Sequence, residues 1–496
     1  MGYETPTSSY NNPDKGIEIG VTVNSKEKGL SAWQLTMMAL GSVIGGSFFL
    51  GSSVAIHSAG PSILISYILG GLLVYFILFA LSEMTVSNPL AGSFRSFATE
   101  AFGKGTGFVT GWVYWTGMVL AMSSEATAVS ILVREWFPNV SIVLLGSCII
   151  IGVTLLNLLG ASKLSKLESG LAAVKVITII AFIILAILIV LGVINGTNES
   201  GTRIVSGEPF LPEGIKGAAG SMLIVLFSYA GFEIIGLASS EAKNPRETIP
   251  KAIHYTVFSL LGLYIGSMTL LLFLIPTHEI TEDTSPIVAA LNRMGIGWAG
   301  AILNFILITA ILSTMLASMF GLGRMIRSLA DEGMAPGWLK ERSDVPYKGI
   351  LFSGFAMLLG LGLGILLPRI YLFLISSGGF AILFTYVIIM ATHIKFRNKN
   401  GKPEDKLKLR GFPYSSLFTL ILLIGAIISM PFISGQGVGL IAGIGMIVFY
   451  TLCYTIIKGI ATIRFKKGSS TNHSINLSDR FSTEFSEELN HTENDK

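Results

Sequence analysis

The chain has 496 residues, of which 51% are hydrophobic and only 13% are charged, and its formal net charge is +4. Soluble domains carry about 25% charged residues, so this composition argues against a soluble enzyme. The net charge is also too small for the basic surface of a nucleic-acid-binding protein, and no nucleic-acid partner is expected.

The chain contains twelve apolar stretches that are long enough to be membrane spans. A bilayer core of about 30 Å needs roughly 20 residues of helix. No loop between the stretches is long enough for a folded soluble domain, so the sequence predicts an all-α integral membrane protein in contact with lipid. The predicted spans are 33–57, 62–86, 106–133, 140–160, 171–194, 217–240, 253–276, 298–323, 349–367, 371–394, 414–434 and 437–463.

The basic residues predict the orientation of these spans. Of the 34 lysines and arginines, 28 lie on the side of the N-terminus and five on the opposite side. The positive-inside rule therefore predicts a multi-pass protein of the cytoplasmic (cell) membrane with both termini in the cytoplasm. The tails 1–29 and 468–496 are polar and are expected to be disordered. The first tail has no apolar segment of a cleavable signal peptide, so a retained helix should direct insertion.

Two spans carry glycine-rich polar segments near their middle, at 41–51 in span 1 and at 227–233 in span 6. Span 1 runs outward and span 6 inward, which is the arrangement that a 5+5 inverted repeat with discontinuous helices 1 and 6 predicts. The alternative is that these glycines only allow helices to pack closely. The matched positions and the polar neighbours favour interrupted helices.

Interrupted helices offer backbone groups to a substrate in the middle of the membrane. The half-helix that starts after Gly45-Gly46-Ser47 in span 1 presents free N–H groups and the positive end of its dipole, which suit a carboxylate. Carbonyl groups freed by the breaks suit an ammonium group. These pairings predict a zwitterionic substrate, although other small charged solutes fit the same pattern. The candidate carbonyls are those near Val43, Ile44, Phe227 and Ala230.

Three titratable residues lie inside predicted spans. Lys175 in span 5 either extends to the cytoplasmic surface or stays buried as an amine that couples proton binding to a conformational change. Glu125 in span 3 and Glu233 after the span-6 break are further candidates for proton coupling. The alternative for both is a hydrogen-bonded carboxyl group that fastens helices together. Glu83 and Glu168, near span ends, are expected to form salt bridges.

The sequence contains no motif that indicates metal binding, catalysis or nucleotide binding. The six histidines are scattered, so no metal site is expected, and no catalytic constellation points to an enzyme. The glycine-rich segment 360–364 lies within a span and lacks the strand and the Lys-Ser/Thr pair of a phosphate loop, so helix packing explains it and no nucleotide partner is expected.

Several motifs carry a resemblance to a known family: GSVIGGSFFLGSS from Gly41, LSEMTVSNPLAGSF from Leu81, FSYAGFEIIGLASSEAKNPRETIPKAI from Phe227 and LADEGMAP from Leu329. On these motifs the chain resembles a bacterial amino acid permease of the amino acid–polyamine–organocation (APC) superfamily, in its amino acid transporter branch. The similarity extends over nearly everything except the tails.

The resemblance implies the leucine-transporter fold and alternating access around a central amino acid site. It implies a first repeat over 30–195, a second repeat over 196–395, and a loop with two final spans over 396–467. The breaks fall at 44–47 and 227–231, and the Phe227 ring gates the substrate. The other residues that the resemblance places at the substrate are Met122, Ser228, Gly231 and Ser318.

By the same resemblance, Lys175 matches a lysine that takes the place of a sodium ion in related proton-coupled carriers, and Glu233 matches the glutamate of the family's span 6. The sequence departs from the family at Ser47, where glycine is usual, and at Leu316, where many members have asparagine. Both positions lie near the expected pocket, so they leave the substrate open.

We therefore expect a secondary active transporter that imports an amino acid with a proton as the coupling ion, and no cofactor. A neutral amino acid is favoured because no arginine or aspartate occupies a recognised pocket position. An amino acid or amine exchanger remains an alternative within the same class. A sensor or receptor that binds the same ligand without transporting it is the alternative from a different class. The sequence does not determine the oligomeric state.

Overall fold

The computed structural model describes residues 29–88, 94–194, 208–237, 242–281, 284–343, 345–365, 369–401 and 407–471. Its account of side chains leaves out those of 161–169, 364–365 and 460–471, which include Glu168. Within the described ranges the regular structure is helical, and the β pairing consists of one isolated bridge between Leu30 and Ala242. The predicted tails lie outside these ranges except for Gly29 and residues 468–471, where the last helix continues.

The chain forms seventeen α-helices in its described part. In chain order they are α1 (Ala32–Val43), α2 (Gly46–Phe49), α3 (Gly51–Ala59), α4 (Ile63–Ser87), α5 (Phe94–Phe102), α6 (Lys104–Val133), α7 (Ile142–Asn157), α8 (Ala161–Val190), α9 (Gly214–Ser228), α10 (Ile234–Leu237), α11 (Pro245–Leu274), α12 (Pro286–Arg293), α13 (Gly297–Asp331), α14 (Tyr347–Ile365), α15 (Ile370–Asn400), α16 (Tyr414–Ser429) and α17 (Gly437–Thr471).

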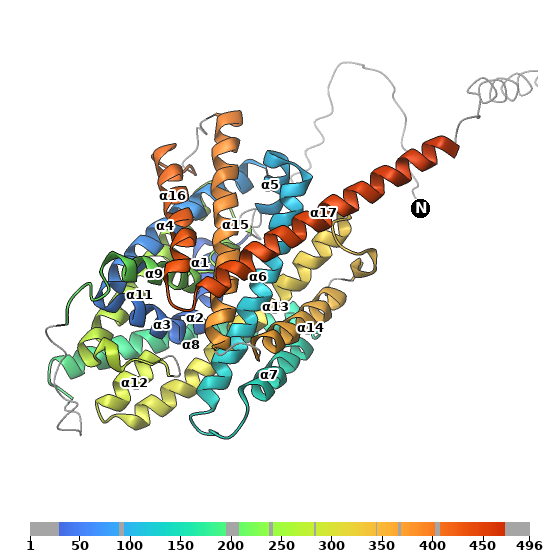
Figure 1. Ribbon diagram of the computed structural model, residues 1–496. Helices are drawn as coiled ribbons and strands as arrows, with labels where there is room; N and C mark the ends of the chain where they lie inside the picture. Colours follow the sequence, from blue (N-terminus) through green and yellow to red (C-terminus); the bar gives the residue numbers. More distant parts are fainter. Residues whose placement is uncertain are drawn as a thin grey trace, which may run out of the picture.

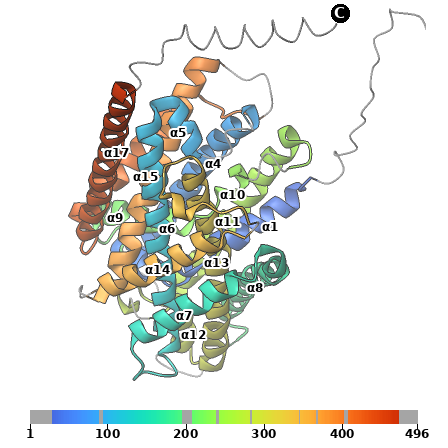
Figure 2. The ribbon, with the colours of Figure 1, turned by 90° about the vertical axis from the view of Figure 1, so that its right-hand side faces the viewer.

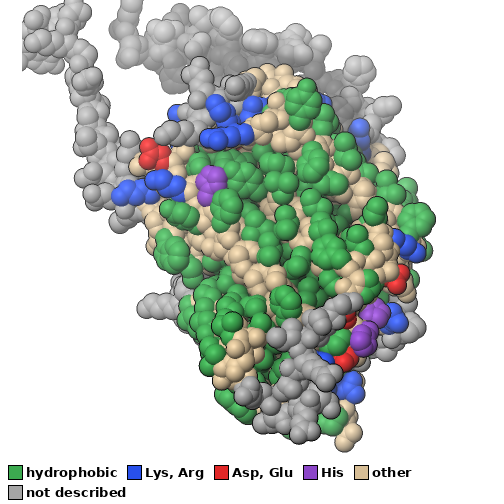
Figure 3. Space-filling model, turned by 90° about the vertical axis from the view of Figure 1, so that its left-hand side faces the viewer, with side chains coloured by type: hydrophobic (Ala, Val, Ile, Leu, Met, Phe, Trp, Pro, Cys, Tyr) green, Lys and Arg blue, Asp and Glu red, His purple; other side chains and the backbone are tan. Residues whose placement is uncertain are grey.

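The expectation of an all-helical membrane protein is confirmed. Eight helical segments in the described part of the chain are long and apolar enough to cross a membrane, and three shorter apolar helices accompany them. Each predicted span coincides with one helix or with a series of helices separated by a break. A band of hydrophobic side chains covers the middle of the face in Figure 3, as lipid contact requires.

The helices form one tilted bundle, with α6 and α15 packed side by side within it (Figures 1 and 2). The short helix α5 lies at one end of the bundle and α12 at the opposite end (Figure 2). Helix α17 crosses the outside of the bundle and extends beyond it (Figure 1). This arrangement leaves the broken helices in the interior.

Two short helices, α5 and α12, were not among the predicted spans. Helix α5 buries Phe94 and Phe97, and α12 buries Ile287 and Leu291. With nine and eight residues they are too short to cross a bilayer. A search for long apolar stretches misses them because only one face of each helix is apolar.

Candidate functional site

The first predicted span is interrupted in its middle. Helix α1 ends at Val43, Ile44 and Gly45 are extended, and α2 begins at Gly46. A Cβ atom at position 46 would lie 2.6 Å from a carboxylate oxygen of Glu125, which is closer than atoms can approach. Glycine at position 46 therefore lets a side chain from α6 reach the backbone at the break.

The sixth predicted span is interrupted as well, between the end of α9 at Ser228 and the start of α10 at Ile234. The non-helical turn covers 229–233, whereas the break was expected at 227–231. Phe227 and Ser228 belong to the last turn of α9, so the break begins two residues later than expected. The reason is that backbone hydrogen bonds continue past Ser228, with the N–H of Ala230 donating to the Phe227 carbonyl at 3.0 Å.

The two interruptions touch each other. The Ser42 hydroxyl donates to the carbonyl oxygen of Gly231 at 2.9 Å. Gly231 has a φ of +105°, and a Cβ atom there would lie 2.8 Å from the Ser42 carbonyl oxygen. Only glycine adopts this backbone readily, and only glycine leaves room for this crossing.

Glu125 binds the backbone at the first break. Its Oε2 accepts from the Gly46 nitrogen at 2.7 Å, and its Oε1 accepts from the Ser47 nitrogen at 3.2 Å. The side chain is buried, with 3% of it exposed. Two N–H groups at the break, beside the half-helix that was expected to bind a substrate carboxylate, are thus held by a carboxylate of the protein itself.

Lys175 lies on the other side of the same break. Its Nζ donates to the Gly41 carbonyl at 2.6 Å and to the Thr314 hydroxyl at 2.7 Å, and its side chain is fully buried. The Thr314 hydroxyl in turn lies 3.1 Å from the Ile44 carbonyl oxygen. The amine therefore points into the break, and the structure does not show it extending to the surface.

Glu233 is held within the second break. Its Oε1 accepts from the Tyr114 hydroxyl at 3.0 Å, and its Oε2 accepts from the Gly231 nitrogen at 2.9 Å and from the Tyr386 hydroxyl at 3.3 Å. Tyr114 belongs to α6 and Tyr386 to α15. This placement matches a carboxyl group that fastens helices, and it leaves a proton-coupling role as a prediction.

An aromatic cluster, made of Phe48, Tyr67, Tyr229 and Tyr264, packs beside the breaks. The rings of Phe48 and Tyr264 are stacked with centroids 4.0 Å apart. The Tyr264 hydroxyl donates to the Ser228 carbonyl at 3.0 Å, at the end of α9. The cluster therefore connects α2, which follows the break in the first span, to the last turn of α9, which precedes the break in the sixth span.

The remaining predicted residues lie around this centre. Met122 precedes Glu125 by one helical turn on α6, and Ser318 follows Thr314 by one turn on α13, so each shares a helix face with a residue at the break. Val43, Ser47, Met122, Leu316, Phe227 and Ser228 are buried, whereas Ala230 and Ser318 are half-buried.

Sequence reasoning missed Ser42, Thr314, Tyr114 and Tyr386, which hold the predicted residues in place. Ser42 lay within the glycine-rich segment, and Thr314 lay in a polar pair within an apolar span. Tyr114 and Tyr386 gave no signal, because their partner Glu233 is far away in the sequence.

Comparison with a family model and with related sequences points to amino acid permeases. A model of the amino acid permease family matches residues 34–471. The chain is 34% identical to the gamma-aminobutyric acid permease of Bacillus subtilis (strain 168), over 85% of this chain and 92% of the relative. It is 30% identical to the aromatic amino acid transport protein AroP of Escherichia coli O6:H1, over 83% of this chain and 91% of that protein.

The fold has a counterpart among solved structures. A crystal structure of a mutant manganese transporter of Eremococcus coleocola superposes with a TM-score of 0.52 over 85% of this chain and 93% of that one. The two sequences are 13% identical, so the likeness concerns the fold alone. It is the fold of transporters of the leucine-transporter type.

Proposed function

The chain belongs to the amino acid permease family, and from this premise we propose that it imports a neutral amino acid by proton symport. Membership makes it a multi-pass membrane transporter of amino acids and not an enzyme. Proton coupling, the preference for a neutral amino acid and the residues that bind proton and substrate are proposed here.

The proposed architecture is twelve crossings with two inverted repeats, over 30–195 and 196–395, and both termini in the cytoplasm. The opposite directions predicted for spans 1 and 6 support it, since inverted repeats place their two broken helices around one central site. The 28 basic residues on one side of the predicted spans support the orientation.

The observation that carries the coupling proposal is the presence of an acid and a base at one break. Glu125 holds the N–H groups of Gly46 and Ser47, and Lys175 holds the Gly41 carbonyl. Buried ionisable groups inside a membrane protein commonly form the path of a proton. The Lys175 amine also fills a position among backbone and hydroxyl oxygens that would suit a sodium ion, which favours a proton over sodium.

In the proposed cycle, a proton from outside binds the Glu125 carboxylate and neutralises it. Glu125 then releases the N–H groups of Gly46 and Ser47, and the carboxylate of the amino acid takes its place. The ammonium group of the substrate binds carbonyl oxygens at the two breaks, near Ile44 and Ala230. The Glu125 carboxylate and the substrate carboxylate compete for the same two N–H groups. The substrate therefore binds only when a proton has neutralised Glu125, which couples the two binding events.

A neutral substrate is supported by two observations. The relatives named above are said to carry gamma-aminobutyric acid and aromatic amino acids, which are zwitterions without net charge. In this chain the half-buried or buried positions beside the breaks carry Met122, Leu316 and Ser318, none of which would pair with a charged side chain. Phe227, at the end of α9, is proposed to cover the bound substrate.

Uptake of radiolabelled amino acids into proteoliposomes tests this function. We expect one or a few neutral amino acids among the twenty to accumulate, and only under an inward proton gradient. Uptake that requires amino acid preloaded inside would replace symport by exchange. Binding without uptake under any gradient would favour a sensor.

A further inference from the structure

A short non-helical segment, 407–411, is held in place at the basic end of the bundle. Glu83 of α4 accepts from the Leu409 nitrogen at 2.9 Å, and Arg397 of α15 donates to the Leu409 carbonyl at 3.2 Å. Glu83 and Arg397 are also ion-paired with each other and are both buried. The expected salt bridge of Glu83 is therefore present, and it fixes the backbone of this segment.

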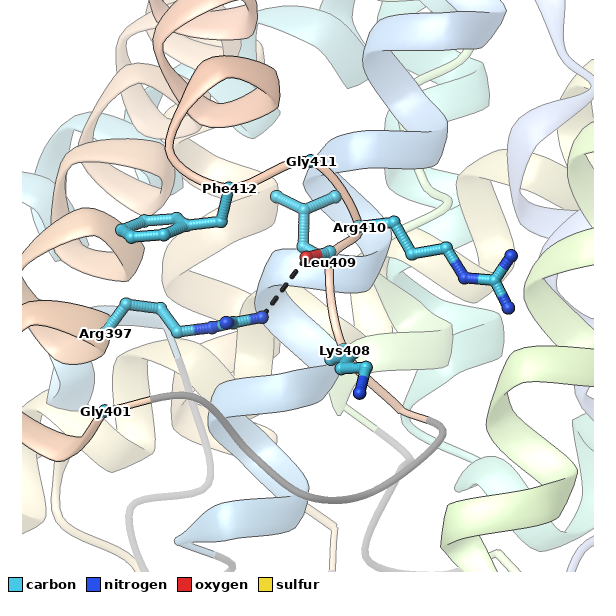
Figure 4. Close-up of a pocket in the computed structure, with 7 residues that line it drawn as sticks. All are labelled: Arg397, Gly401, Lys408, Leu409, Arg410, Gly411 and Phe412. Carbon is cyan, nitrogen blue, oxygen red and sulfur yellow. Dashed lines mark hydrogen bonds between the residues drawn. The ribbon is translucent and has the colours of Figure 1, made fainter.

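The held backbone determines where two cations point. Leu407 and Leu409 are buried, whereas Lys408 is half-buried and Arg410 is exposed. In Figure 4, Arg397 and Arg410 extend to opposite sides of the segment. Among the described residues, neither Lys408 nor Arg410 pairs with a carboxylate.

Lys408 and Arg410 line two hollows. One has a volume of about 480 Å³ and also involves Arg397, Gly411 and Phe412 (Figure 4). The other has a volume of about 290 Å³ and is walled by aromatic rings and Pro250. We call the second hollow the aromatic groove. Besides Pro250 and the two cations, its lining residues are Tyr75, Phe76, Phe79 and His254.

The aromatic groove lies between α4 and α11 and opens onto an apolar surface. The His254 ring lies 5.5 Å from the Tyr75 ring and stacks on Phe258 of the next turn. Phe258 is 65% exposed, and Ile65, Ile68 and Leu72 on α4 are exposed too. In Figure 3, basic side chains and a histidine gather at the edge of the hydrophobic band.

We propose that Lys408 and Arg410 bind the phosphate of an anionic phospholipid whose acyl chains lie along α4 and α11. Basic hollows between membrane helices, at the level of the headgroups, are typical sites of anionic lipids. Here the cations are unpaired among the described residues, the walls are aromatic, and the exposed apolar surface begins directly below. The orientation proposed above places this site in the cytoplasmic leaflet.

A lipid is favoured over a free phosphate because the aromatic groove is mostly apolar. A free phosphate needs several hydrogen-bond donors around it, whereas Tyr75, Phe76 and Phe79 offer apolar ring surface to hydrocarbon. A lipid fits both parts of the site, because its phosphate can contact Lys408 and Arg410 while its glycerol and acyl chains contact the aromatic rings of the groove.

Native mass spectrometry of the purified full-length protein tests this proposal. The lipids are phosphatidylglycerol and phosphatidylcholine with the same acyl chains. We expect the wild type to bind phosphatidylglycerol roughly tenfold or more tightly than phosphatidylcholine, since each cation near the bilayer surface favours an anionic lipid. The double variant Lys408→Gln/Arg410→Gln should lose this preference.

The matched control is Lys340→Gln/Arg342→Gln, which removes two exposed cations with the same spacing from another loop at the same end. It should keep the wild-type preference, and thermal unfolding should show that both double variants fold. Equal binding of the two lipids by the wild type, or an unchanged preference in Lys408→Gln/Arg410→Gln, would overturn the proposal. Displacement of phosphatidylglycerol by an excess of inorganic phosphate would assign the site to free phosphate instead.

Discussion

The carboxylate of Glu125 lies 2.7 Å from the backbone nitrogen of Gly46, so a side chain of α6 holds the first N–H group after the break in the first span. An N–H group at a helix break is a natural ligand of a carboxylate. Because the protein supplies that carboxylate itself, a substrate must compete with Glu125 for it. This competition is the physical basis of the proposed coupling.

Glu125→Gln should uncouple transport from the proton gradient. Its amide oxygen still accepts a hydrogen bond from Gly46 or Ser47, but the side chain no longer takes up a proton. We expect exchange of labelled for unlabelled substrate to persist while gradient-driven accumulation is lost. Measurement of both activities in the same proteoliposomes checks this. Accumulation at the wild-type level by Glu125→Gln would remove Glu125 from the mechanism.

Lys175→Met should abolish gradient-driven uptake. Methionine keeps the length and the apolar stem of lysine, but it leaves the Gly41 carbonyl without its charged donor. Lys216→Met is the matched control, because Lys216 is exposed in the first turn of α9, at the opposite end of that helix from the break. Uptake should fall to background in the first variant and stay near wild type in the second. Full uptake by Lys175→Met would exclude Lys175 as a coupling residue.

Gly231→Ala should separate the two broken helices. The new Cβ atom would lie 2.8 Å from the Ser42 carbonyl oxygen, and the positive φ alone costs alanine about 1–2 kcal/mol. We expect a lower melting temperature and a loss of transport. Gly262→Ala on α11 is the control, because no atom lies within 4 Å of its Cβ position. Equal behaviour of the two variants would mean that the close crossing is not needed.

Arg397→Gln should destabilise the protein strongly. It removes the buried guanidinium that pairs with the Glu83 carboxylate and leaves that carboxylate only the Leu409 N–H and the nearby His393 ring, and breaking such a buried pair costs about 3–5 kcal/mol. Lys399→Gln is the control, because its ion pair with Glu100 is exposed and is worth about 1 kcal/mol or less. Thermal unfolding in detergent compares the two. A melting temperature equally close to wild type in both variants would show that Glu83 does not depend on Arg397.

Amino acid amides and methyl esters should compete poorly for uptake. Both lack the negative charge that the N–H groups of Gly46 and Ser47 attract in this account. Competition against a labelled substrate measures this directly, with the free amino acid as the reference. An amide that competes as well as the free amino acid would show that the carboxylate is not recognised at this break.

The sequence was informative about features that are local in the chain. Apolar stretches gave the positions of the long helices, and the clustered glycines around Gly45 and Gly231 marked both breaks. It was less informative about helix ends: α9 continues two residues further than expected, because hydrogen bonds at Tyr229 and Ala230 extend its last turn.

The contacts between distant residues could not be predicted from one sequence. Glu125 was a candidate because a carboxyl group inside a span is rare, but nothing in the sequence indicated that it binds Gly46, 79 residues earlier. The same holds for Tyr114 and Tyr386, which meet Glu233 only because α6 and α15 pack together. Packing of helices decides these pairs, and a single sequence carries no direct record of it.

The most direct test of the central claim is proton movement driven by substrate. Proteoliposomes with a pH-sensitive dye inside, and with no initial gradient, receive the amino acid that the uptake panel identifies. Proton symport predicts acidification of the interior when substrate is added, and none for Glu125→Gln or Lys175→Met. Substrate uptake by the wild type without any acidification would contradict proton symport.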